Sequence, residues 1–130
     1  MNLINADVAY ANSLLARQKN RRLIFDDLAI YFNNQVNKNS KKGNMAIIFR
    51  WTDFGLNEDF ATEEELTAEL LENILAAGYE AEFCYCSPGA YNPCGIAVGW
   101  GKEAEERIKL LIEETAGLYR GDENGTDEYP

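Results

Sequence analysis

The spacing of hydrophobic and polar residues predicts six elements along this chain. Helical spacing predicts three helices, over Ala6 to about Asn37, 62–77 and 102–115. Between them, runs rich in β-branched and aromatic residues predict three strands, over 45–51, 79–86 and 94–100. The predicted order is α-β-α-β-β-α. This order indicates an α+β domain with a long N-terminal helix, a mainly antiparallel sheet of about three strands, and two further helices packed on it.

The first predicted helix has two apolar groups separated by the polar stretch RQKNRR. The first group comprises Val8, Ala11, Leu14 and Leu15; the second begins at Ile24. A continuous helix would be roughly 48 Å long, which exceeds the body of a domain this size. The helix therefore bends near Asn20, folds back as a helical hairpin, or projects its first part away from the body. In the last case its apolar stripe would be exposed and would need a partner. The pattern leaves these alternatives open.

Local signals refine the other elements. Thr62 with Glu65 has the spacing of a capping box, and Gly78 follows the same helix as a terminator. The strand 45–51 is apolar on both faces, as a central strand would be. The strand 79–86 alternates strictly, which predicts an aromatic face on the core and a second face carrying glutamates and cysteines. We divide the chain into an arm (1–23), a body (24–117) and a tail (118–130), whose acidic, glycine-rich composition predicts disorder.

Charge is distributed unevenly along the 130 residues. The net charge is −10, but residues 1–50 carry +5 and residues 51–130 carry −15. This asymmetry favours either electrostatic complementarity between subunits or an acidic surface that meets a basic partner. The overall negative charge argues against nucleic acid as a partner, although RQKNRR could touch phosphate. No apolar run reaches the roughly 20 residues of a membrane span, and the N-terminus does not resemble a signal peptide.

The composition also limits the chemistry. The chain has no histidine, so it lacks a Ser-His-Asp or Cys-His pair, and no phosphate-loop motif occurs. Glu63/Glu64 and Glu113/Glu114 are carboxylate pairs on exposed helix faces, where solvated charge is the ordinary interpretation. We therefore expect a protein that is not an enzyme and uses no cofactor.

The three cysteines, Cys84, Cys86 and Cys94, follow the pattern C-x-C-x7-C. A zinc site needs four ligands in paired spacings, which this pattern does not supply, so we expect no metal. A Cys86–Cys94 bridge across the neck of a hairpin is geometrically feasible but needs an oxidising compartment. We favour three reduced thiols on the hairpin and hence an intracellular protein.

The stretches NNQVNKNSKKGNMAIIFRW, LLENILAAGYEAEFCY and GIAVGW place a helix before a Lys/Ser/Gly turn and a strand, and a Gly-Tyr helix end before a second strand. In this order the chain resembles, over residues 24–100, a loose class of small tailed-phage proteins, many of which have no assigned role. The resemblance implies a viral origin and a place in the host cytoplasm or the virion. It brings no catalytic residues.

These observations predict a non-enzymatic structural protein of a phage particle that docks neighbouring protein subunits in a homo- or hetero-oligomer. The predicted contact residues are Tyr10, Leu14, Arg17, Lys19, Arg21 and Arg22 on the arm, and Tyr119, Arg120 and Tyr129 on the tail. Removing 1–22 or 118–130 is expected to break assembly and leave the fold intact.

Two alternatives stay open. One is a phage-encoded acidic inhibitor of a host enzyme or defence complex, which binds protein through Glu63, Glu64, Glu65, Glu113 and Glu114. The other is small-ligand binding at the hairpin between Tyr85 and Trp100, which requires a pocket.

Overall fold

The computed structural model describes residues 1–56, 58–115 and 117–121. Its helices are α1 (Ala6–Lys41), α2 (Glu64–Ala76) and α3 (Ala104–Glu114), with two 3-10 helices at Trp51–Phe54 and Glu58–Thr62. Its strands are β1 (Ala46–Arg50), β2 (Glu80–Tyr85), β3 (Gly95–Gly99) and β4 (Tyr119–Arg120). The four strands form one antiparallel sheet in the order β1-β3-β2-β4. The α+β class is confirmed, with one strand more than predicted.

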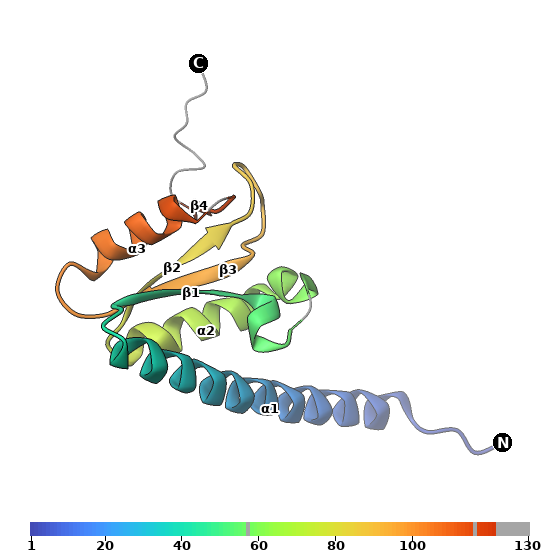
Figure 1. Ribbon diagram of the computed structural model, residues 1–130. Coiled ribbons are helices and arrows are strands. Elements are labelled where there is room, and N and C mark those ends of the chain that lie inside the picture. Colours follow the sequence, from blue (N-terminus) through green and yellow to red (C-terminus); the bar gives the residue numbers. More distant parts are fainter. Residues whose placement is uncertain (57, 116, 122–130) are drawn as a thin grey trace.

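The sheet is covered on both faces. In Figure 1, α3 lies on one side of the sheet, and α2 and the body end of α1 lie on the other. The core on the side of α1 and α2 contains Leu28, Phe32, Phe49, Trp51, Phe60, Leu70, Ile74, Ile96 and Val98. The core on the side of α3 contains Cys84, Ala97, Ile108, Ile112 and Leu118. Every residue of β3 is buried, because this strand has a neighbour on each edge and a helix layer on each face.

Two glycines of β3 let neighbouring elements approach closely. A Cβ on Gly95 would overlap the carbonyl oxygen of Phe49 and lie 2.9 Å from the Cα of Arg50. A Cβ on Gly99 would lie 3.1 Å from the carbonyl oxygen of Ala104, at the start of α3. Glycine at these two positions therefore sets the spacing of β1 and α3 against the central strand.

Two predictions about individual strands are wrong. The segment 45–51 was expected to be a central strand, but among the described strands β1 pairs with β3 alone and lies at the edge of the sheet. Both of its faces are apolar because helices pack above and below the strand. This pattern does not require a neighbouring strand on each edge. The glutamate and cysteine face of β2 was expected to lie away from the core, but Cys84 on that face is fully buried under α3.

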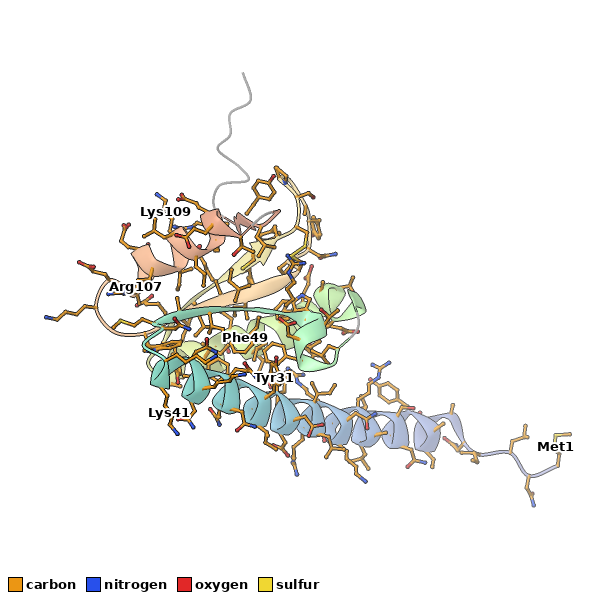
Figure 2. The ribbon with its side chains drawn as sticks, in the orientation of Figure 1. Met1, Tyr31, Lys41, Phe49, Arg107 and Lys109 are labelled. Atoms are coloured by element: carbon orange, nitrogen blue, oxygen red, sulfur yellow. A yellow bond between two sulfur atoms is a disulfide. The ribbon has the colours of Figure 1, made fainter. Side chains whose placement is uncertain are left out.

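The first helix is continuous from Ala6 to Lys41, so it neither bends near Asn20 nor folds back as a hairpin. The side chain of Asn5 caps its start by accepting a hydrogen bond of 2.7 Å from the backbone N–H of Asp7. Its second half packs on the body through Leu28 and Phe32, and Tyr31 makes an edge contact with Phe49 of β1 (Figure 2). Its first half projects beyond the body (Figure 1).

The predicted capping box at Thr62 is not formed. Residues 58–62 make a 3-10 helix instead, and α2 begins two residues later, after Glu63, whose side chain makes no capping hydrogen bond. The predicted end of this helix is correct, because Gly78 follows it with φ of 98°, a conformation that glycine adopts without strain.

The segment 118–121 belongs to the body and not to a separate tail. Leu118 is buried in the core under α3, and Tyr119–Arg120 form β4, which pairs with β2. The expected disorder is therefore wrong for these first residues, and their packing counts against the expectation that removing 118–130 would leave the fold intact. Composition averaged over the whole acidic segment hid the short apolar and basic start that completes the sheet.

Candidate functional site

The arm presents apolar side chains to solvent on more than one side of α1. Tyr10 and Leu15 are 67% and 66% exposed, and Val8 is half exposed. Leu14, which follows the body-facing stripe towards the N-terminus, is still 41% exposed. All of residues 1–20 are exposed in the isolated chain, and Figure 2 places Met1 at the free end and Lys41 beside the body. A helix with this much uncovered apolar surface is typical of a protein contact site.

Basic residues mark the point where the arm leaves the body. Arg17, Lys19 and Arg22 are exposed on α1. Arg21 instead lies against α2, where its Nη2 is 2.6 Å from Oε1 of Glu69 and its Nη1 is 3.8 Å from Oε2 of Glu65. Of the six residues predicted on the arm, Arg21 is thus the one that forms ion pairs with its own body.

An apolar groove of about 230 Å³ runs between α1 and α2. It is lined by Phe25, Leu28, Ala29, Phe32, Leu70, Asn73, Ile74 and Ala77. A more polar hollow of about 310 Å³ shares Phe25 with it and continues towards the arm, past Arg22, Asp26 and Glu69. Sequence reasoning missed this groove, because it arises only when two helices far apart in the sequence lie side by side.

Of the predicted tail contacts, Tyr119 and Arg120 lie in the described part of the chain, and they differ in exposure. Tyr119 is 37% exposed, but Arg120 is 8% exposed, and its Nε lies 2.7 Å from Oε2 of Glu82. This ion pair joins β4 to β2 and neutralises a carboxylate on the face that α3 covers. Arg120 therefore stabilises the sheet of its own chain. Tyr129 lies outside the described residues.

The expectation of three free thiols is wrong. Cys86 and Cys94 form a disulfide across the neck of the β2–β3 hairpin, with their Cα atoms 5.9 Å apart, and Cys84 is free and buried. The argument for a reducing compartment from cysteine usage loses its basis, and the intracellular location stays a prediction. The disulfide also borders an open cavity of about 390 Å³ beside Arg50, Trp51 and Thr62. The pocket that small-ligand binding requires therefore exists near this hairpin.

Within the described residues, no group of three or more Asp, Glu or Cys side chains is arranged to hold a metal ion. None of the helices in the same part of the chain is both long and apolar enough to cross a membrane.

Comparison with known proteins adds no relative. No protein-family model, curated protein or solved structure matches the chain.

Proposed function

We propose that this protein is a non-enzymatic assembly component whose projecting first helix docks on neighbouring protein subunits. The observation that carries the proposal is the arm itself, whose apolar side chains are exposed while the rest of α1 is anchored to a complete two-sided core. A helical segment of about 15 residues without tertiary contacts is marginal in water. A bound neighbour would supply the contacts that stabilise it.

The charge layout supports the same proposal. The arm exposes Arg17, Lys19 and Arg22, whereas the start of α2 exposes Glu63 to Glu65. Arg17 and these glutamates line one hollow within the chain, and Arg21 contacts Glu69, so Lys19 and Arg22 are the basic side chains of the arm that are left for a neighbour's carboxylates. The resemblance to tailed-phage proteins suggests a phage particle as the setting.

A second candidate is the acidic inhibitor, which the exposed glutamates at the start of α2 favour. Glu113 and Glu114, however, lie on α3, on the opposite side of the sheet, so the two acidic groups do not form one continuous face. The inhibitor would have to bind through one group alone. Charge reversal of Glu63 and Glu64 would then abolish binding to its target, and charge reversal of Glu113 and Glu114 would not.

Removing residues 1–22 tests the docking proposal. The truncated chain should keep the cooperative unfolding of the body, since the two cores begin at Ile24, and light scattering should show that it stays at the mass of one chain. The full-length protein should form larger species. A full-length chain that is monomeric, with backbone amides of the arm protected from hydrogen exchange, would contradict docking, because the arm would then be stable without a neighbour.

A further inference from the structure

One side of α1 carries a repeat that continues from the arm into the body. Its members are spaced alternately by three and four residues: Val8, Ala11, Leu15, Gln18, Arg22, Phe25, Ala29 and Phe32. This is the spacing of the a and d positions in a heptad repeat, which places them along one seam of the helix. Val8 and Leu15 are exposed in the arm. Phe25, Ala29 and Phe32 line the groove between α1 and α2, and Phe32 presents only its edge there, because it is 8% exposed and packs on Phe49 and Tyr79 of its own body.

The order of apolar and polar residues along this seam is the same from either end, so two copies of the seam match when they run antiparallel. Its two polar members stand at the centre, with three apolar members on each side. Antiparallel alignment about that centre pairs Val8 with Phe32, Ala11 with Ala29, Leu15 with Phe25 and Gln18 with Arg22. Each pair joins an a position to a d position, which is the pairing that an antiparallel coiled coil requires.

We propose that the neighbour docked by the arm is a second copy of this chain. The two α1 helices pair antiparallel, so that the arm of each copy lies in the α1–α2 groove of the other. This names the partner in the function proposed above and rests on it. The contact is isologous, since the same seam serves both copies, and it closes as a dimer. The paired seams overlap over about 36 Å.

The groove suits this occupant in shape and in charge. Leu14 is one heptad before Arg21, which contacts α2, so Leu14 is on the α2 side of the seam. In the pair it meets Leu70 and Ile74, which line the groove of the other copy. At the centre, Arg22 lies in the hollow that also contains Asp26 and Glu69. Arg21 lines the same hollow and pairs with Glu69, so near the two-fold axis each subunit balances two guanidinium groups with two carboxylates.

Parallel pairing is disfavoured by the same residues. It would place Arg22 against the Arg22 of the other copy and Gln18 against Gln18, and like charges at a seam position are repulsive. It would also leave both arms side by side, with neither groove filled.

Two leucines of similar exposure give a matched test. Leu15 is 66% exposed and lies on the seam, whereas Leu23 is 52% exposed and lies off it. The native chain is expected to change from 14.7 kDa to twice that mass as its concentration rises in sedimentation equilibrium. Leu15→Asp should raise the dissociation constant at least about tenfold, while Leu23→Asp leaves it unchanged. A chain that stays monomeric, or variants that behave alike, would overturn the inference.

Cross-linking tests the orientation independently. Ala11 and Ala29 are both exposed, so a cysteine at either position is tolerated. A mixture of Ala11→Cys and Ala29→Cys chains should form a disulfide-linked dimer, and neither variant alone should do so. Linkage of Ala11→Cys to itself would show parallel pairing and overturn the proposal. A native chain that is monomeric, with arm amides that exchange freely, would overturn the dimer inference alone. The proposed function, in which the arm docks on another protein, would then stand with a different protein as the partner.

Discussion

Cys84 shows at the residue scale what the sequence pattern reveals and what it hides. The alternation along β2 correctly separates its two faces, but it does not show that α3 covers the face carrying Cys84 and Glu82. Burial, together with the nearby Glu82 carboxylate, raises the pKa of the Cys84 thiol from its ordinary value of 9.0 to about 12, and Arg50 opposes this shift. The sequence pattern placed Glu82 on a solvent-exposed face, because its ion-pair partner Arg120 lies far along the chain and was not recognised.

This pKa predicts a loss of stability in alkali. Between about pH 9 and pH 12 the folded chain keeps the Cys84 proton while the unfolded chain releases it, so the free energy of unfolding falls as pH rises. The slope from this group is about 1.4 kcal/mol per pH unit. Denaturant unfolding at several pH values should show a smaller slope in Cys84→Ala. Equal slopes in the two proteins would mean that the thiol is not held in its neutral form.

At the scale of elements, the three helices and the three longer strands were predictable, and the way in which they connect and pair was not. Periodicity located α1, α2 and α3 within a few residues, since each buries a stripe at helical spacing. The 3-10 helix 58–62 displaced the start of α2, and β4 was too short to leave a periodic signal. The groove between α1 and α2 and the Cys86–Cys94 bridge depend on contacts between elements, which spacing within one element does not encode.

The disulfide predicts a measurable stabilisation of the β2–β3 hairpin. Cys86 and Cys94 are separated by eight positions, and closing a loop of this length in the unfolded chain is worth about 2–3 kcal/mol. Replacing both by serine should lower the free energy of unfolding by about this amount. A thiol assay on the denatured, unreduced protein should find one thiol, that of Cys84. Three thiols, together with unchanged stability of the double variant, would contradict the bridge.

At the scale of the whole molecule, the chain consists of a closed body and an open arm. In the body, helices cover both faces of the sheet, Leu118 packs in the core and Arg120 belongs to the last strand. In the arm, the apolar side chains are exposed. A projecting arm was one of the alternatives that the apolar stripe of the first helix left open, and five of the six residues predicted on it are exposed. It could not predict that Arg21 binds α2, which requires the fold.

The boundary of the body gives a further prediction. A chain ending at Gly121 retains β4 and the buried Leu118 and serves as the reference. A chain ending at Gly117 loses a buried leucine and the Glu82–Arg120 ion pair, so it should be less stable by at least about 3 kcal/mol in urea unfolding. Equal stability of the two truncations would show that β4 contributes nothing to the body.

The account depends most on the claim that the arm is completed by a protein neighbour. Hydrogen exchange of the backbone amides of residues 8–20, followed from dilute to concentrated protein, measures this directly. We predict rapid exchange in dilute solution and protection that rises with concentration, while the amides of α3 stay protected throughout. Arm amides that are protected to the same degree at every concentration would contradict the account, because the helix would then need no neighbour.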